Sequence, residues 1–308
     1  NHYQAEFGGA GGLRGNLTSQ NAITSAPGYV PLQWNGFGGF LLGLQSFHGK
    51  DVQELEMTAR EWQMAAYIRD RWQIGEKLTL SLGLRLEHYP LMTRANDKGI
   101  ERLDYNTYTI LMGGYGPTPK DVGINIKEWY LAPRLGATYR LTENTVIRAG
   151  YGRTINPLPW SRPLRGSYPF DIYYNNTAEQ YAWLGTLQDG IPPVAVPDLS
   201  SGVIPLPRNT YMRSPNPDAV DRAVLQQANV AVEQRLPGNL AVEVAYVHGR
   251  SDDGYADRDL NYGQPGGGNA SRQYFNVAGT TGIVDWAGRT KRRYNALQVA
   301  LNRPFRNG

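Results

Sequence analysis

The chain of 308 residues contains no cysteine, which excludes a disulfide framework and any zinc site built on thiolates. It also lacks a run of about 18 apolar residues, which a transmembrane helix would require. Charged side chains are scarce, at 19% of residues. The Lys and Arg residues are scattered and form no basic stripe, so the net charge of +4 does not indicate a nucleic-acid partner.

Glycine and tyrosine are abundant instead, with 36 and 20 residues, and this composition favours β structure and long loops over helices. The stretch "LTLSLGLRLEHY" (78–89) places a leucine at every second position from Leu78 to Leu86, with Thr79, Ser81 and other small or polar residues between. A period of two predicts a strand with one apolar and one polar face. The pattern leaves open whether the apolar face meets a protein core or lipid.

Three segments share this alternation and are each divided by a short polar turn, so each is predicted to be a β-hairpin. The segments are residues 61–89, 133–153 and 225–249, with turns at 75–77, 142–144 and 237–239. A fourth alternating segment, "YNALQVALNRPF" (294–305), predicts one more strand.

The connections between these hairpins are long and rich in Gly, Pro, Asn and Tyr, at about 91–128, 155–221 and 251–291. Strict alternation of short turns and long loops is typical of outer-membrane barrels, with short periplasmic turns and long extracellular loops. The predicted fold class is therefore all-β, part of a large antiparallel transmembrane β-barrel whose leucines face lipid. A soluble β-sandwich is the alternative.

Two further sets of residues fit the barrel. Charged side chains of the polar phase are expected to pair across strands in a wet lumen: Arg85, Glu87, Arg134, Arg140, Arg148, Glu233, Arg235 and Glu243. Aromatic residues near strand ends are expected to form interfacial girdles: Trp62, Trp72, Tyr89, Tyr130, Tyr151 and Tyr246.

Several segments resemble, in content and in order, the barrel of Oar-like TonB-dependent outer-membrane proteins. They are "FLLGLQSF" (40–47), "YIRDRWQIGEKLTLSLGLRLEHY" (67–89), "APRLGATYRLTENTVIRAGYGR" (132–153), "LQQANVAVEQRLPGNLAVEVAYVHG" (225–249), "RDLN" (258–261) and "YNALQVALNRPFRNG" (294–308).

The resemblance implies a plugged barrel of about 22 strands, of which about ten would lie in residues 1–308. It places the protein in the cell outer membrane and implies active transport of a bulky solute or peptide, driven through TonB, without giving the direction. Expected partners are outer-membrane lipid, the TonB complex acting through a plug region outside this sequence, and other envelope proteins. The family's N-terminal regulatory-like domain, its plug and its remaining strands are absent here, so we expect the chain to be part of a longer polypeptide.

Catalysis finds little support, and we expect no enzyme activity, cofactor or metal. The four histidines are scattered, and no H-E-x-x-H or G-x-S-x-G motif occurs. Residues 251–259 gather Asp252, Asp253, Asp257 and Asp259, whose carboxylates could hold Ca²⁺. Their spacing misses the EF-hand pattern, which favours a solvated loop.

The segment 160–185 is the best candidate for ligand contact, because aromatic rings offer a large contact area at low entropic cost. Its aromatic residues are Trp160, Tyr168, Phe170, Tyr173, Tyr174, Tyr181 and Trp183. The alternative is that these rings only pack the loop or cap the barrel rim. Three functions stay open: a TonB-dependent transporter or receptor, a passive or structural outer-membrane barrel, and a secreted glycan-binding β-sandwich.

Overall fold

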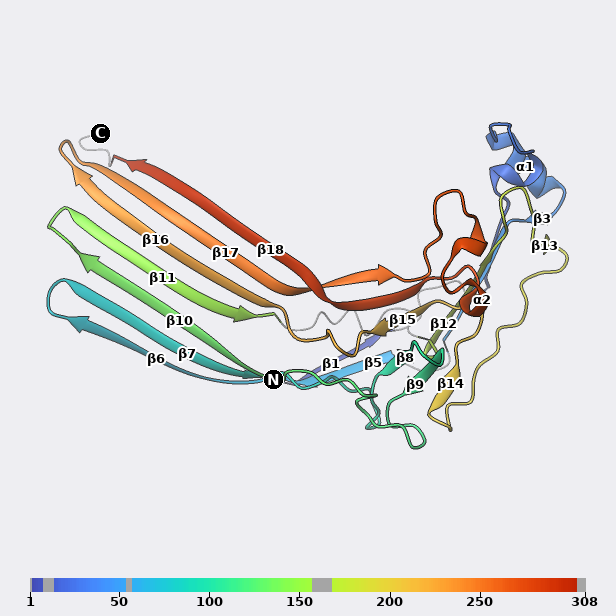
Figure 1. The fold of residues 1–308 in the computed structure, drawn as a ribbon, viewed down its shortest axis with the longest axis horizontal. Helices are drawn as coiled ribbons and strands as arrows, with labels where there is room; N and C mark the ends of the chain where they lie inside the picture. Colours follow the sequence, from blue (N-terminus) through green and yellow to red (C-terminus); the bar gives the residue numbers. More distant parts are fainter. Residues whose placement is uncertain (1, 8–13, 54–56, 157–167, 304–308) are drawn as a thin grey trace.

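The computed structural model describes residues 2–7, 14–53, 57–156 and 168–303. The molecule is elongated: long strands form a broad sheet at one end, and the connections between them gather at the other (Figure 1). We call these two parts the sheet and the body.

Among the described residues, the sheet has seven long strands in the order β18-β17-β16-β11-β10-β7-β6, all antiparallel. They are β6 (Met64–Ile74), β7 (Leu78–His88), β10 (Trp129–Arg140), β11 (Thr145–Ile155), β16 (Val224–Leu236), β17 (Leu240–Asp259) and β18 (Ile283–Asn302). The short β15 (Met212–Pro215) runs parallel to the start of β18. The described residues thus give eight strands in this sheet, against about ten expected for residues 1–308, and this sheet does not close on itself.

All three predicted hairpins are confirmed, as β6–β7, β10–β11 and β16–β17. Left-handed backbone conformations at Gly75 (φ 60°), Gly238 (φ 79°) and Asn239 (φ 60°) make two of the turns, and Gly and Asn tolerate these conformations best. The three turns lie together at the end of the sheet farthest from the body (Figure 1). The separation of short turns from long connections is as predicted.

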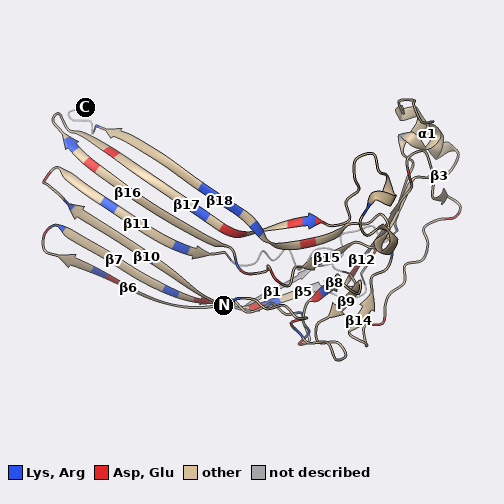
Figure 2. Cartoon of the chain, viewed as in Figure 1, with Lys and Arg blue, Asp and Glu red and all other residues tan. Residues whose placement is uncertain are grey.

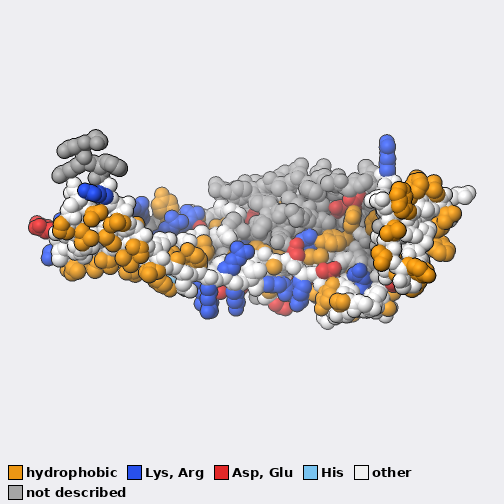
Figure 3. Space-filling view, turned by 90° about the horizontal axis from the view of Figure 1, so that it is seen from above, with side chains coloured by type: hydrophobic (Ala, Val, Ile, Leu, Met, Phe, Trp, Pro, Cys, Tyr) orange, Lys and Arg blue, Asp and Glu red, His pale blue; other side chains and the backbone are white. Residues whose placement is uncertain are grey.

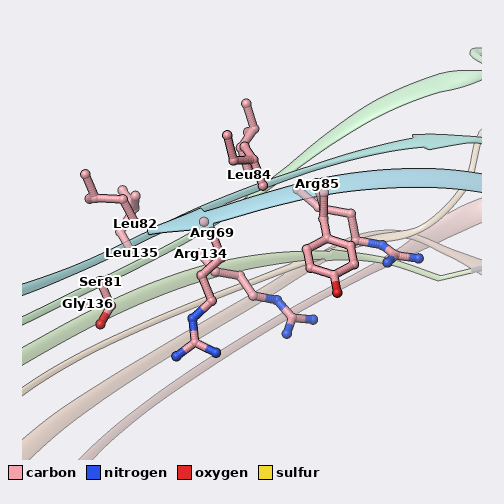
Figure 4. A pocket seen from close by; sticks show the side chains of 12 residues that line it. Arg69, Ser81, Leu82, Leu84, Arg85, Arg134, Leu135 and Gly136 are labelled. Carbon is pink, nitrogen blue, oxygen red and sulfur yellow. The ribbon is translucent and has the colours of Figure 1, made fainter. Parts of the chain in front are cut away.

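The sheet has one apolar and one polar face, as the alternation predicts. Leu80, Leu82 and Leu84 lie opposite Ala137, Leu135 and Pro133 of β10. Leu82, Leu84 and Leu135 point to one side, and Arg69, Arg85 and Arg134 to the other (Figure 4). Asp70 on β6 interrupts the apolar face, and its carboxylate accepts a hydrogen bond from the Trp72 indole.

The apolar face is not covered by a second sheet in the part of the chain that the structure describes. Leu84 is 45% exposed and Leu297 is 71% exposed, whereas a soluble sandwich would bury such side chains between its sheets. On the polar face, Arg148 pairs with Glu233 at 2.7 Å and with Glu243 at 3.4 Å. These pairs confirm the predicted cross-strand pairing for three of the eight charged residues.

The long connections are not open loops but fold into the body. Its strands form small sheets in the orders β12-β4-β2, β14-β9-β8, β13-β3 and β1-β5. Their bounds are β1 (His2–Phe7), β2 (Asn16–Thr18), β3 (Leu44–Gln45), β4 (Phe47–Gln53), β5 (Met57–Trp62), β8 (Glu101–Asp104), β9 (Thr109–Met112), β12 (Asp171–Thr177), β13 (Gly185–Thr186) and β14 (Val203–Pro205). The helices are α1 (Gln33–Leu41), α2 (Phe275–Ala278) and two 3-10 turns, η1 (Asn21–Thr24) and η2 (Asn269–Ser271).

A hydrophobic core holds the body together. Its most buried members come from separate connections: Leu103, Ile110, Met112, Ile172, Met212 and Ile283 are all at most 1% exposed. Ile283 begins β18, so the sheet and the body share this strand. The core explains how connections of this length stay ordered, because each one buries apolar side chains against the others.

Two details differ from the sequence prediction. Both ends of the segment 251–291 are strand, because β17 extends to Asp259 and β18 begins at Ile283. Tyr89 and Tyr130 do not join an exposed aromatic girdle. They are buried in a small cluster with Ile155, since Tyr130 lies opposite Glu87 and therefore on the polar side. Trp62, Trp72 and Tyr246 are about half exposed or more, as a girdle requires.

We predict that the buried ion pair of Glu61 and Arg222 stabilises the junction of sheet and body. Both side chains are at most 2% exposed, and an Arg222 Nη2 donates to Glu61 and to the Pro90 carbonyl. Glu61→Gln leaves a buried cation without its counter-charge and should cost about 3–5 kcal/mol of unfolding free energy.

Denaturant unfolding measures this loss. The matched control is Glu128→Gln, since Glu128 is 43% exposed where it pairs with His88; an exposed pair contributes only about 0–1 kcal/mol. Equal losses in both variants would contradict the prediction.

Candidate ligand-contact surfaces

The six described aromatic residues of segment 160–185 do not form one surface. Trp160 lies outside the described residues. Tyr168 and Phe170 are each 3% exposed and belong to the core of the body. The Arg94 guanidinium lies 5.0 Å from the centroid of the Phe170 ring and pairs with Glu101 at 2.6 Å. The predicted ligand contact is corrected for Tyr168 and Phe170, because their burial leaves almost no surface for a ligand.

Tyr173 and Tyr174 lie on β12 and point to opposite faces of that strand, as neighbours in a strand do. Tyr173 is 40% exposed and lines a cavity of about 180 Å³ with Asn16, Lys50 and Asp51. The Tyr174 ring stacks on His48 at 5.8 Å, with its hydroxyl 3.4 Å from the His48 Nε2. Tyr173 thus keeps a free face, whereas Tyr174 has a packing role.

Trp183 and Tyr181 lie apart from these residues. Trp183 is 57% exposed and lines a second hollow, of about 450 Å³, with Glu179, Asn209 and Phe275. Tyr181 is half-buried and has a positive φ of 68°. Ligand contact stays a prediction for the exposed residues, Tyr173 and Trp183, and the six aromatic residues that the structure describes are not brought together.

An apolar surface that the sequence prediction did not single out surrounds α1. Trp34 is 69% exposed, and Phe37 and Phe40 are 55% and 57% exposed and stack on each other at 6.5 Å. Hydrophobic side chains gather over this end of the molecule (Figure 3). The sequence does hold a signal for it, since residues 15–49 contain no Asp, Glu, Lys or Arg.

The polar face of the sheet is the second candidate surface. A shallow hollow of about 570 Å³ runs along β6, β7 and β10, where Arg69, Arg85 and Arg134 lie on the same side of the sheet (Figure 4). Gly83 separates Arg69 from Arg134 in the cross-strand register, and Gly152 lies on the other side of Arg134. Because glycine has no side chain, the two guanidiniums have open space beside them.

The aspartates of residues 251–259 are engaged separately rather than converging on a cation. Asp252 accepts from Arg250 Nε at 2.6 Å, Asp257 pairs with Arg213, and Asp259 accepts from the backbone amides of Asn261 and Ile283. They belong to β17, so the solvated loop expected here is corrected to a paired strand. In the described ranges, no group of three or more His, Asp or Glu side chains is placed to hold a metal ion.

No helix within the described residues has the length and hydropathy to cross a membrane.

Comparison with known families gives one match over the whole length: the family model described as "Outer membrane beta barrel domain" covers residues 1–308. No curated protein matches the chain.

Several solved structures are similar to part of the fold. The siderophore receptor PirA of Pseudomonas aeruginosa is 14% identical, with 82% of this chain and 34% of the receptor covered and a TM-score of 0.40. A double mutant of the Serratia marcescens hemophore receptor HasR, in complex with its hemophore HasA and heme, is 14% identical, with 83% and 37% covered and a TM-score of 0.40. A mutant of the ferric enterobactin receptor PfeA of Pseudomonas aeruginosa is 11% identical, with 82% and 36% covered and a TM-score of 0.33. The chain spans about a third of the length of these receptors.

The carboxyl groups beside Tyr173 predict a pH dependence of the body. Burial raises the pKa of Asp51 to about 6, with a further contribution from the nearby Asp171. Between about pH 4 and 6, the Asp51 carboxyl is therefore still protonated in the folded state, whereas in the unfolded chain it has already lost its proton. The pairing of β4 with β12 should weaken as the pH rises through this interval and stay weaker above it.

Hydrogen exchange of β4 and β12, corrected for the intrinsic exchange rate at each pH, measures the effect. Asp51→Asn should flatten the dependence, because the amide does not titrate. Asp198→Asn is the control, since that carboxylate lies on an exposed turn. An unchanged dependence in Asp51→Asn would refute the assignment.

Proposed function

Because this chain belongs to the outer membrane beta barrel domain family and so lies in the outer membrane, we propose that it forms part of a TonB-dependent transporter of the Oar-like type. Its cargo is a bulky solute or peptide. The sheet supplies a stretch of barrel wall, and the body supplies the surface that first meets the cargo. The transport step is driven from the inner membrane through TonB, and no catalytic reaction is part of this function.

The membrane fixes the orientation of the sheet. The apolar face meets lipid, the short turns are periplasmic and the body is extracellular, as in other barrels of this class. Within the hydrocarbon layer every backbone polar group needs a partner. Among the described strands, β6 and the turn-side half of β18 each have one neighbour. Both edges are therefore expected to pair with further strands, as a larger barrel provides.

One observation favours transport over a purely structural role: the polar face holds cations beside open space. Arg69 and Arg134 are separated by a glycine and line the hollow described above. A small barrel fills its interior with its own side chains, whereas large outer-membrane transporters hold a plug in the lumen. Guanidiniums next to glycines leave room for such a plug and for an acidic group of the cargo.

A passive or structural barrel is the second candidate, and the packed body favours it. Buried apolar side chains from several connections make this part rigid, which suits a scaffold for other envelope proteins. The secreted β-sandwich is excluded, because the family match and the uncovered apolar face both contradict it.

An uptake experiment separates transport from the passive and structural roles. Cells with and without the complete protein are given a tryptic digest of casein, and the loss of each peptide from the medium is measured by mass spectrometry. Protein-dependent loss that a protonophore abolishes is the expected result. Loss that persists with the protonophore would indicate a passive pore, and no difference between the strains would indicate a structural role.

We predict that the exposed aromatic residues of the body contribute to capture. Tyr173→Ala and Trp183→Ala should each reduce the rate of uptake several-fold at low peptide concentration, since one aromatic contact contributes about 1 kcal/mol. Tyr262→Ala is the control, because Tyr262 is 58% exposed but lines neither of the two hollows. Equal uptake by all three variants would remove these residues from the site.

Lipid contact of the apolar face is tested by a pair of neighbouring substitutions. Leu82→Arg places a charge in the hydrocarbon layer and should cost about 2–4 kcal/mol or prevent assembly, whereas Ser81→Arg on the polar face should be far milder. Heat-dependent migration of the assembled protein on gels, together with urea unfolding in detergent, compares the two. Equal costs would contradict the orientation.

A further inference from the structure

A row of three arginines and one glutamine crosses four neighbouring strands on the lipid side of the sheet. Arg153 of β11 lies opposite Gln226 of β16, Gln226 opposite Arg250 of β17, and Arg250 opposite Arg293 of β18. Along each strand these residues are in the same alternating phase as Tyr151, Val230, Tyr246 and Leu297, which belong to the apolar face. We call these four residues the arginine row. Figure 2 shows Lys and Arg on β17 and β18 partway along the strands.

The row lies at the height where lipid headgroups begin. A transmembrane strand crosses the hydrocarbon layer in about 9–11 residues. Arg250 follows the first residue of β17, Leu240, by ten positions, and Gln226 precedes the last residue of β16, Leu236, by ten. Since the short turns are periplasmic, the arginine row marks the outer-leaflet border of the apolar band.

The row has an excess of positive charge. Arg250 and Arg293 lie directly opposite each other, an arrangement that is unfavourable for like charges. Lys291 is exposed and follows in the same phase. Asp252 accepts from Arg250 Nε at 2.6 Å and offsets one charge. Arg153 Nε is buried and has no hydrogen-bond partner among the described residues.

Polar side chains just below the row make the transition to the apolar band. Tyr151 donates from its hydroxyl to Gln226 at 2.9 Å. Tyr246 donates to the Asn295 side-chain oxygen at 2.8 Å, and His248 Nδ1 lies 2.8 Å from the same oxygen. An occupant that touches both levels must be apolar below and anionic above.

On the other flank of the sheet, formed by β6, β7 and β10, different side chains lie at the end of the strands nearest the body. There His88 and Trp129 stack with ring centroids 4.3 Å apart, and Trp129 is 54% exposed. Aromatic side chains of this kind anchor a barrel at the interface without selecting a headgroup. Among the described strands of the sheet, the arginines of the apolar phase at this level lie on β11, β17 and β18.

We propose that the arginine row binds the phosphate groups of outer-leaflet lipids, with the lipid chains lying on the apolar face below it. Guanidinium groups form bidentate hydrogen bonds with phosphate, and β11, β17 and β18 present them at one level, with Gln226 of β16 between. An acidic protein would match the charge but not the apolar band that continues directly beneath. The proposal rests on the outer-membrane location and does not depend on the transport function.

The test uses the complete protein purified in a neutral detergent. Lipid A, which carries two phosphates on a disaccharide, is titrated against phosphatidylcholine, and bound lipid is counted by native mass spectrometry. Preferential retention of lipid A is expected. Combined Arg153→Gln, Arg250→Gln and Arg293→Gln should weaken it at least about tenfold, since each cation near a charged membrane surface contributes measurably.

A matched control removes three charges from the opposite face. Combined Arg69→Gln, Arg71→Gln and Arg134→Gln changes the net charge equally, and Arg69 and Arg134 lie on the polar face (Figure 4). This variant should retain lipid A like the unchanged protein. Equal loss in both variants would show that only net charge matters and would overturn the proposal.

Two further experiments address a variant that fails to assemble and binding of free phosphate in place of lipid. If the triple Gln variant fails to assemble, two other variants replace it: the single Arg293→Gln and the triple replacement of the same arginines by Lys. The triple Lys variant should keep binding lipid A, and the single Arg293→Gln variant should lose part of the binding. Inorganic phosphate at millimolar concentration should not displace lipid A. Full displacement, or unchanged binding in every row variant, would contradict a lipid site.

Discussion

The membrane-spanning part of this protein depends on one constraint: no backbone polar group can be left unpaired in lipid. A sheet meets this constraint by pairing each strand with two neighbours, and the pairing fixes the phase of every side chain. A shift of one residue would turn Leu82 to the polar side and Ser81 to lipid. The three tight turns hold the register of each hairpin, so the whole distribution of polar and apolar residues follows from them.

The same strand pairing also connects the sheet to the body. β17 and β18 are each 20 residues long, about twice the length needed to cross the hydrocarbon layer. Their upper halves enter the body, where Ile283 and Trp286 are buried in its core. The body is therefore connected to the wall by continuous strands rather than by flexible loops, and its hollows keep a defined position above the barrel.

Surface chemistry divides the molecule into three levels. The lower level of the sheet is apolar towards lipid and charged towards the lumen. At the headgroup level, aromatic residues lie on one flank and the arginine row on the other. The body carries the exposed aromatic residues Tyr173 and Trp183 and, around α1, the exposed side chains of Trp34, Phe37 and Phe40. We propose a different contact for each level: lipid chains, lipid phosphates and extracellular cargo.

The sequence predicted the wall well because alternation and turns are local properties. The turns at Gly75 and Gly238 were enough to place two hairpins, and the alternation from Leu78 to Leu86 was enough to assign the two faces of the first. The body was predicted poorly, because its strands are as short as two residues and pair across large sequence separations. Its core joins Leu103, Ile172 and Met212, which no local pattern relates.

The candidate ligand-contact residues, too, were predicted only in part from the sequence. Composition alone made the aromatic residues of 160–185 candidates for ligand contact, and only the tertiary structure separated the buried ones among the described residues from the exposed ones. Tyr168 and Phe170 became core because other connections fold over them, whereas Tyr173 kept an open face. The arginine row could not be seen in the sequence, since Arg153, Arg250 and Arg293 are separated by many residues. Strand register brings them to one level, and register is set by pairing over the whole sheet. The sequence determined which residues alternate; tertiary pairing decided which of them meet.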